Sequence, residues 1–396
     1  MLKLKNQIKD YAWGSKSLIP KYLGQKPSDE PQAEIWYGAH PDSPSVTEVG
    51  PLDSVLEQHP AFLAGSNLKL DKLPYLVKML AADSALSLQV HPTKAQAKKG
   101  FAFEEKQGIS RDAGHRNYKD GNHKPEIIYA LTTFEALCGF RKLEQTIEIF
   151  TELEDENSKL AESELFEQLQ VSLQDKQGIK SAFTFLLNKP EGIENLVNQC
   201  VKTARSIKNS KHRKEYETIV DLQELYPGDP GVILSLMLNR VSLKPGQAIF
   251  LPAGNVHAYL KGLGIEVMAS SDNVLRGGLT PKHMDITELL EVVEFKATDV
   301  SFLEPEEDEL GRAILHPPFE EFQLQIMELK ADEHANIAQN GPTIFLVGNG
   351  EVACESTVES LTLKTGESVF IAQDEAPVIV SAKQQTQSFA VTVNEK

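Results

Sequence analysis

Gln89 and His91 are two good metal-ligand side chains that stand two positions apart in the stretch SLQVHP (87–92). Alternate residues of a β-strand share one face. If this apolar stretch is a strand, the amide and the imidazole point together while Leu88 and Val90 point the other way. The pair is therefore a candidate for half of a metal site. Most such pairs on strands, however, are surface residues or hydrogen-bonded core residues.

Two further candidate ligands lie downstream. Glu126 begins an apolar stretch in NHKPEIIYAL, and His257 follows a glycine turn in LPAGNVHAYL. Two imidazoles, one carboxylate and one amide oxygen suit zinc, which can keep a position open for water or substrate. The absence of cysteine ligands leaves iron, manganese and cobalt open. Taken singly, Glu126 is also explained as a surface charge and His257 as a hydrogen-bonded core histidine, but their joint position at strand ends favours a metal site.

Other ionisable side chains crowd the same stretches, namely His123, Lys124, Glu266, Asp272 and Arg276. Lys124 stands two positions before Glu126 and can share its face. Arg276 lies among glycines in RGG, where its guanidinium can meet an anion through two parallel hydrogen bonds. An ion pair between Arg276 and Asp272 is the structural alternative. The polar segment 100–123 is either a mobile lid or an ordinary surface loop.

The composition excludes several classes of protein. A net charge of −17 argues against a nucleic-acid partner, which usually meets a basic surface. Three widely spaced cysteines argue against both a disulfide framework and a thiolate metal site. No apolar run is as long as a membrane span, and the start MLKLKNQIKDYAWGS lacks the apolar core of a signal peptide. We therefore expect a cytoplasmic protein without a membrane partner.

The texture of the sequence changes twice along the chain. Short strand-like runs and turns fill residues 1–140, and amphipathic helical patterns follow over about 141–217. A turn at 226–231 restores strand-like texture, which continues from about 302 to the end. The pattern predicts a mainly β protein with a helical insertion.

One internal repeat bears on the fold. LKPGQAIFLPAGNVH (243–257) resembles LKTGESVFIAQDEAP (363–377), with a glycine turn between two strand-like runs in each. This pattern suits the jelly-roll barrel of cupins, so we expect two such barrels, although chance similarity of two hairpins is the alternative. His257 of the first copy corresponds to Pro377 in the second, which predicts that only the first barrel binds metal.

Taken together, the motifs resemble one family, the type I mannose-6-phosphate isomerases. The stretches that carry the resemblance are YAWGS (11–15), EIWYGAHP (34–41), SLQVHP (87–92) with Lys94, NYKDGNHKPEIIYALTTFEALCGFR (117–141), LPAGNVHAYLKGLGIEVMASSDNVLRGGLTPKH (251–283) and the terminal strands. The resemblance covers nearly the whole chain. Only the helical texture matches between about 141 and 230.

The resemblance implies a catalytic cupin-like barrel from residues 1–140 and 218–301, a helical domain at 141–217 and a degenerate second barrel at 302–396. It also implies that one zinc ion is bound by Gln89, His91, Glu126 and His257. The implied reaction interconverts mannose 6-phosphate and fructose 6-phosphate, a step in carbohydrate metabolism that also feeds GDP-mannose biosynthesis. The implied partner is a hexose phosphate, and we expect a monomer.

The expected mechanism is proton transfer between C1 and C2 through a cis-enediolate. Lys124 and Glu266 are the alternative bases, and His123 or Asp272 can assist ring opening. Arg276, Lys124 and Lys94 are the expected substrate contacts. Two other functions remain open: an iron-dependent cupin dioxygenase, and a sugar-phosphate-binding protein without catalysis.

Overall fold

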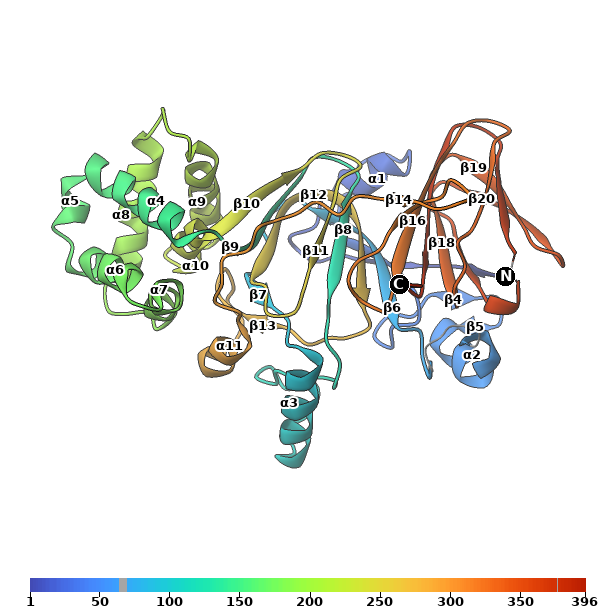
Figure 1. Ribbon diagram of the computed structural model, residues 1–396, viewed down its shortest axis with the longest axis horizontal. Coiled ribbons are helices and arrows are strands. Elements are labelled where there is room, and N and C mark those ends of the chain that lie inside the picture. The colour runs from blue at the N-terminus through green and yellow to red at the C-terminus, as the bar shows by residue number, and fades with distance from the viewer. Residues whose placement is uncertain (64–69, 376) are drawn as a thin grey trace.

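The computed structural model describes residues 1–63, 70–375 and 377–396. Its parts follow one another along the longest axis, with a group of helices at one end, a large sheet in the middle and the C-terminal strands at the other end (Figure 1). The expected combination of antiparallel sheets with helices is confirmed. Within the described ranges, no helix is long and apolar enough to cross a membrane.

The middle of the molecule is a ten-stranded antiparallel sheet. Its strands are β2 (Gln7–Lys9), β3 (Glu34–Tyr37), β6 (Tyr75–Ala82), β7 (Gln89–Val90), β8 (Glu126–Ala130), β9 (Phe134–Phe140), β10 (Leu238–Leu243), β11 (Ala248–Leu251), β12 (His257–Ala269) and β13 (Leu275–Arg276). The longest strand, β12, pairs with β9 over its first residues and with β6 and β8 over the rest. Gly262 lies at this change of partner with φ +132°, and a Cβ there would come within 2.7 Å of the Thr133 carbonyl oxygen. Glycine is therefore needed where β12 leaves β9.

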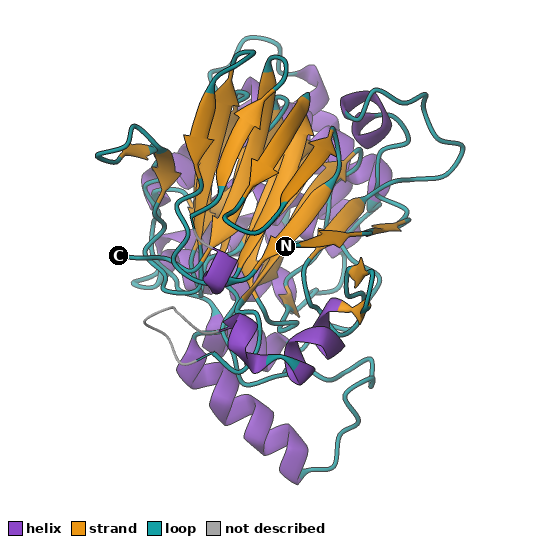
Figure 2. Ribbon diagram, turned by 90° about the vertical axis from the view of Figure 1, so that its right-hand side faces the viewer, coloured by secondary structure: helices purple, strands orange, loops and turns teal. Residues whose placement is uncertain are grey.

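The C-terminal strands form a seven-stranded and a four-stranded antiparallel sheet, and Figure 2 looks onto this end of the molecule. They are β14 (Glu306–Glu307), β15 (Ala313–Leu315), β16 (Gln323–Leu329), β17 (His334–Asn336), β18 (Thr343–Asn349), β19 (Glu351–Glu355), β20 (Ser360–Lys364), β21 (Ser368–Ile371), β22 (Ile379–Ala382) and β23 (Thr386–Thr392). The first strand of the chain, β1 (Leu2–Leu4), pairs with β21. Phe370 and Phe389 share one apolar cluster with Tyr37 and Tyr75, so the C-terminal sheet packs directly on the middle one.

The internal repeat forms the same local structure twice. β10 and β11 are joined by a turn at Gly246, with φ +90°, and β20 and β21 by a turn at Gly366, with φ +79°. Both turns need a left-handed residue, which explains the glycine in each copy. The copies diverge immediately afterwards, because the first runs into His257 and the second into Pro377.

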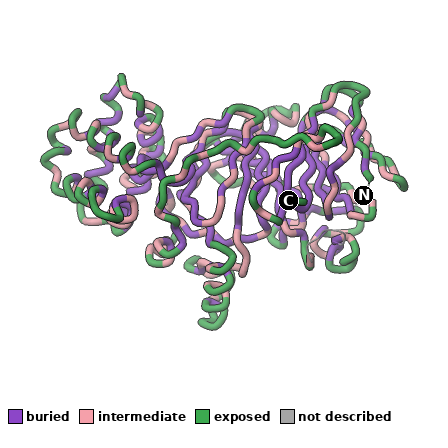
Figure 3. Tube along the Cα trace, viewed as in Figure 1, coloured by how far each residue is buried: buried purple, intermediate pink, exposed green. Residues whose placement is uncertain are grey.

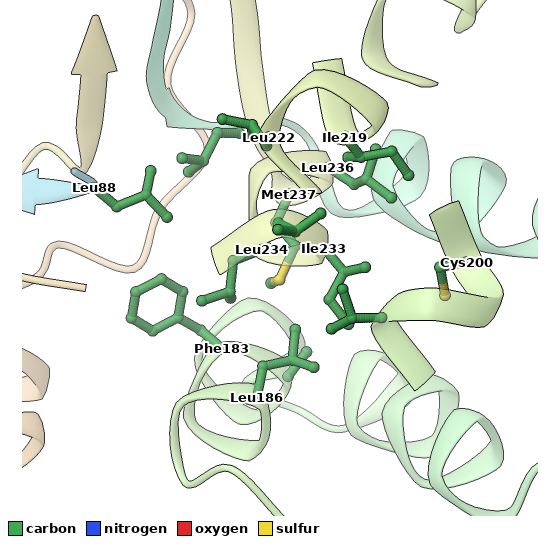
Figure 4. Packing of buried hydrophobic residues seen from close by; sticks show 14 of the residues in the cluster. Leu88, Phe183, Leu186, Cys200, Ile219, Leu222, Ile233, Leu234, Leu236 and Met237 are labelled. Atoms are coloured by element: carbon green, nitrogen blue, oxygen red, sulfur yellow. The ribbon is translucent and has the colours of Figure 1, made fainter. Parts of the chain in front are cut away.

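The inserted helices are α4 (Leu143–Glu156), α5 (Ser158–Ala161), α6 (Glu164–Gln174), α7 (Gly178–Leu187), α8 (Ile193–Ser206), α9 (Arg213–Leu225) and α10 (Gly231–Leu234), followed by the 3₁₀ turn η2 (Ser235–Met237). Their outer faces are exposed, and their inner faces are buried with the strands (Figure 3). Leu88, which is fully buried, belongs to the same apolar cluster as Phe183, Leu186 and Leu234 (Figure 4). Burying such a leucine stabilises the fold by about 1.5–3 kcal/mol. Leu88 thereby fixes the chain immediately before Gln89.

The remaining elements lie beside the middle sheet or beside the C-terminal strands (Figure 1). They are α1 (Leu18–Tyr22), the strands β4 (Val46–Thr47) and β5 (Gly50–Pro51), α2 (Leu52–Gln58), η1 (Pro60–Leu63), α3 (Lys94–Lys106), α11 (Ile286–Val292) and η3 (Gln373–Glu375). Helix α3 projects away from the sheet, and its first turn follows β7 directly (Figure 1). Part of the stretch 100–123 is therefore helical rather than loop.

Candidate active site

Three of the four expected ligands meet at one point of the middle sheet. The ligand atoms of His91, Glu126 and His257 all lie within 4.8 Å of one another, and all three residues are buried. The Nε2 atom of His91 is 3.3 Å from Glu126, and that of His257 is 3.5 Å from it. Glu126 begins β8, His257 begins β12, and His91 follows β7, so three strand ends bring these side chains together.

Backbone carbonyl groups fix both imidazoles in one tautomer. Nδ1 of His91 donates to the Asn273 carbonyl at 2.7 Å, and Nδ1 of His257 donates to the Asn255 carbonyl at 3.0 Å. With Nδ1 protonated, the neutral rings each carry a lone pair on Nε2 that faces Glu126. Burial lowers the pKa of His91 to about 4, which keeps this ring neutral.

Two polar atoms at this point are buried and have no hydrogen-bond partner among the described residues, namely Nε2 of His91 and Oε2 of Glu126. An unpaired buried polar atom costs about 1–3 kcal/mol, so it calls for an explanation. A cation bound between these atoms supplies one. Burial disfavours the charge of Glu126, but Lys124 and the imidazoles hold its pKa well below its usual range. The residues present therefore fit a divalent metal.

Gln89 and Arg276 lie at the edge of this cluster. The Gln89 amide donates to Nε2 of His257 at 3.3 Å, and turning the amide over presents its oxygen at the same place. β7 pairs with β13 so that Arg276 is opposite Gln89, and paired residues of antiparallel strands share a face. Arg276 thus points to the side of the sheet that carries the cluster.

Among the described residues, Lys124 is the lysine that forms an ion pair with this cluster. Its Nζ lies 3.1 Å from Oε1 of Glu126, and its side chain is 10% exposed. Glu266, the other candidate base, is in a different environment. Its carboxylate forms an ion pair of 3.0 Å with Lys78, and burial raises the pKa of Glu266 although Lys78 acts in the opposite direction.

Lys78 was missed by the sequence analysis. It lies on β6 opposite Glu266 of β12, and it also contacts Glu34 at 3.4 Å. The coulombic attraction of these carboxylates outweighs burial and raises the pKa of Lys78. The available signal was a single lysine inside the otherwise apolar strand YLVKMLAA, because a buried lysine needs a carboxylate partner.

A cavity of about 500 Å³ opens beside the cluster and is rich in cations. Its lining includes Lys119, Arg276, Lys282, His283 and Asp272. Burial lowers the pKa of Lys282, and the neighbouring Arg276 and Lys119 lower it further. The positive charges of these three side chains repel one another, and an anion bound between them would offset that repulsion. The sequence did not lead us to expect site roles for Lys119, Lys282 and His283. The signal that could have indicated them was their place in the polar loop motifs NYKDG and LTPKH.

The other candidate residues have partners of their own. Asp272 contacts His40 and Arg111, at 3.1 and 3.4 Å, and no ion pair with Arg276 occurs in the described part of the chain. His123 contacts Glu321. Lys94 lies 3.7 Å from Glu321 with its side chain 54% exposed, and it does not line the cavity that contains Arg276.

Together these features define a candidate mononuclear metal centre and, next to it, a cavity lined by several cationic side chains. Comparison with known proteins gives the family. A family model described as phosphomannose isomerase type I, catalytic domain, matches residues 1–143, a range that contains three of the four candidate ligands. Mannose-6-phosphate isomerase of Escherichia coli (strain K12) is 37% identical over 96% of this chain and 97% of its own. Mannose-6-phosphate isomerase 2 of Arabidopsis thaliana is 33% identical over 93% of this chain and 88% of its own.

Solved structures agree with the sequence relatives. A crystal structure of a mannose 6-phosphate isomerase bound with zinc and yttrium superimposes with a TM-score of 0.88 at 34% identity, covering 100% of this chain and 99% of that one. The enzyme from Salmonella typhimurium, bound to its substrate and a zinc atom, gives the same TM-score, identity and coverage. The chain therefore belongs to the type I mannose-6-phosphate isomerase family.

Proposed function

We propose that this protein is a zinc-dependent isomerase that interconverts mannose 6-phosphate and fructose 6-phosphate. The observation that carries the proposal is the buried His91–Glu126–His257 cluster, with its unpaired ligand atoms, beside a cavity lined by cations. One zinc ion per chain is held by these three residues and Gln89. When bound, zinc supplies a Lewis acid that stabilises negative charge on the sugar oxygens.

The phosphate group of the substrate binds among Arg276, Lys119 and Lys282. These three side chains line one cavity, and their mutual repulsion is relieved by a dianion. The guanidinium of Arg276 also lies on the face that carries Gln89. Arg276 therefore spans the phosphate and the reacting end of the sugar. Lys94, which lies outside this cavity and 3.7 Å from Glu321, is a further substrate contact.

The sugar ring opens before isomerisation. Asp272 accepts the proton of the anomeric hydroxyl, the C1–O5 bond breaks, a C1 carbonyl forms, and His123 donates a proton to O5. Asp272 suits this role because it lines the cavity.

One base then moves a proton between C1 and C2 through a cis-enediolate. We assign this step to Lys124, with Glu266 as the alternative. The support is geometric: Lys124 lies against the ligand Glu126, whereas the Glu266 carboxylate is engaged by Lys78. The positive charge of Arg276 stabilises the enediolate.

The finer divisions of the fold belong to the same proposal. We assign residues 1–140 and 218–301 to a catalytic cupin-like jelly-roll barrel, 141–217 to a helical domain and 302–396 to a degenerate second barrel. The repeated strand–glycine turn–strand unit supports the two barrels. We also propose that the enzyme acts as a cytoplasmic monomer in mannose metabolism and in supplying GDP-mannose biosynthesis.

A coupled assay for fructose 6-phosphate made from mannose 6-phosphate tests this function. Activity should disappear on chelation and return with Zn²⁺. An oxygen electrode run in parallel should show no consumption, since consumption would indicate a dioxygenase. Tight binding of mannose 6-phosphate without any product would instead support a sugar-phosphate-binding protein and refute the isomerase.

A further inference from the structure

His40 is a buried histidine that is not one of the candidate ligands. It follows β3, its side chain is 3% exposed, and its Nε2 lies 3.1 Å from Oδ1 of Asp272. The backbone N–H of Asp42 donates to Nδ1 at 3.3 Å. A ring nitrogen that accepts an N–H has no proton of its own, so the neutral ring carries its proton on Nε2 and donates it to Asp272. His40 thus offers Asp272 one donor in a fixed direction.

The surroundings leave this pair little freedom. The rings of His40 and Trp36 pack in a T-shaped arrangement with 5.0 Å between their centroids, which restricts the imidazole plane. On the other side, the backbone N–H of Asp272 donates to Asp120 at 2.8 Å, and Arg111 donates to Oδ2 at 3.4 Å. The carboxylate is therefore held at both oxygens and at its own backbone. A group that must accept a proton from a bound hydroxyl benefits from this kind of preorganisation.

We propose that His40 is a positioning residue that aims the Asp272 carboxylate at the anomeric hydroxyl and keeps it ready to accept that proton. The inference rests on the proposed function and adds a residue that touches no substrate. Burial works against the charge of Asp272, but the hydrogen bond from His40 opposes burial, and the pKa of Asp272 is lowered to about 2. Lys119 and Lys124 act in the same direction, Arg111 adds a further positive charge, and the carboxylates of Asp42 and Asp120 face the pair as well.

A second cation site is the competing explanation, because ligand atoms of His40, Asp42 and Asp272 lie within 4.8 Å of one another. The contacts favour the positioning role. Nδ1 of His40 already accepts a backbone N–H, Nε2 is directed at a carboxylate, and the guanidinium of Arg111 lies where it would repel a metal ion. The two explanations differ in metal content, which can be measured.

The test uses four variants of the zinc-loaded enzyme and one control. His40→Phe keeps the ring but removes both nitrogens, and it should lower kcat by about 10–100-fold, the usual effect of removing an orienting partner, with little change in KM. His40→Gln keeps an N–H donor and should recover most of that loss. The double variant His40→Phe/Asp272→Asn should be no slower than Asp272→Asn, because both changes act through one group. His59→Phe, at an exposed site, is the matched control.

An isotope effect separates this role from a merely structural one. With substrate deuterated at C2, slowing the ring opening should mask the isotope effect of proton transfer, so the effect should shrink in His40→Phe. Four outcomes would each overturn the inference. The first two are multiplicative losses in the double variant and a full isotope effect in His40→Phe. The other two are wild-type turnover in His40→Phe or Asp272→Asn, and a second metal equivalent that is lost with His40. An inactive wild type in the coupled assay would overturn the proposed function itself.

Discussion

The carboxylate of Glu321 accepts a hydrogen bond of 2.5 Å from Nε2 of His123, a residue 198 positions earlier in the chain. Glu321 lies just before β16 of the C-terminal part, whereas His123 lies in the loop before β8. Burial disfavours the charge of Glu321, but His123 holds its pKa below the usual value. The C-terminal strands therefore supply a side chain that orients a candidate catalytic residue.

We expect Glu321→Gln to lower kcat by about 10–100-fold, because it replaces the charged acceptor that fixes the His123 ring. The zinc content and the melting temperature should stay near wild type. Glu320→Gln changes an exposed neighbour in the same way and should have no effect. Steady-state kinetics on both variants decide the matter, and equal activities would show that His123 needs no orienting partner.

His91→Ala and His257→Ala should each lose zinc while keeping the fold. Each change removes one ligand nitrogen, whereas the strands around it are held by their own apolar clusters. Elemental analysis should show little bound zinc, circular dichroism should match the wild type, and turnover should fall at least about 100-fold.

His59→Ala is a suitable control for this pair because His59 is exposed and outside the cluster. Should either ligand variant keep full zinc and full turnover, the ligand assignment fails.

Much of the candidate metal site could be predicted from the sequence, because side chains alternate between the two faces of a strand. A period of two placed Gln89 and His91 on one face, and the structure brings His91 together with Glu126 and His257. The repeated glycine turn likewise predicted the same strand–turn–strand unit twice, and both units occur. These features are local, so a few neighbouring residues determine them.

The long-range partners could not be predicted in this way. Lys78 and Glu266 face each other only because β6 and β12 pair in one particular register, and Glu321 reaches His123 only because the C-terminal part packs on the middle sheet. The joining of β1 to β21 depends on the same packing. Strand register and inter-sheet packing are set by the sum of many apolar contacts, and no short motif encodes them.

The purified protein should contain one tightly bound zinc ion per chain. The second copy of the repeat carries Pro377 where the first carries His257, and within the described part of residues 302–396 no cluster of metal-ligand side chains occurs. Elemental analysis of protein dialysed against a weak chelator measures the ratio. Two zinc ions per chain would reject the degenerate-barrel hypothesis.

Arg276 and Lys282 should differ in which kinetic constant they change. A residue that only holds the phosphate binds ground state and transition state alike, so Lys282→Ala should mainly raise KM. Arg276→Ala should raise KM and also lower kcat, because Arg276 lies opposite Gln89 and reaches the charge that develops on the sugar. Lys330→Ala, at an exposed site far along the chain, serves as the charge-matched control. A pure KM effect in both variants would assign Arg276 to the phosphate alone.

The identity of the base can be decided by hydrogen exchange. In D₂O, the isomerase reaction should place deuterium at C1 or C2 of the sugar, and only the variant that lacks the base should lose both turnover and exchange while it still holds zinc. We expect this of Lys124→Ala, with a loss of about 10²–10⁴-fold, because Lys124 lies 3.1 Å from Glu126 while Glu266 is bound by Lys78. Wild-type exchange in Lys124→Ala would reject that assignment, and wild-type exchange in Glu266→Gln would reject the alternative. If both variants exchange normally, the proton is moved by another residue or by water in the site.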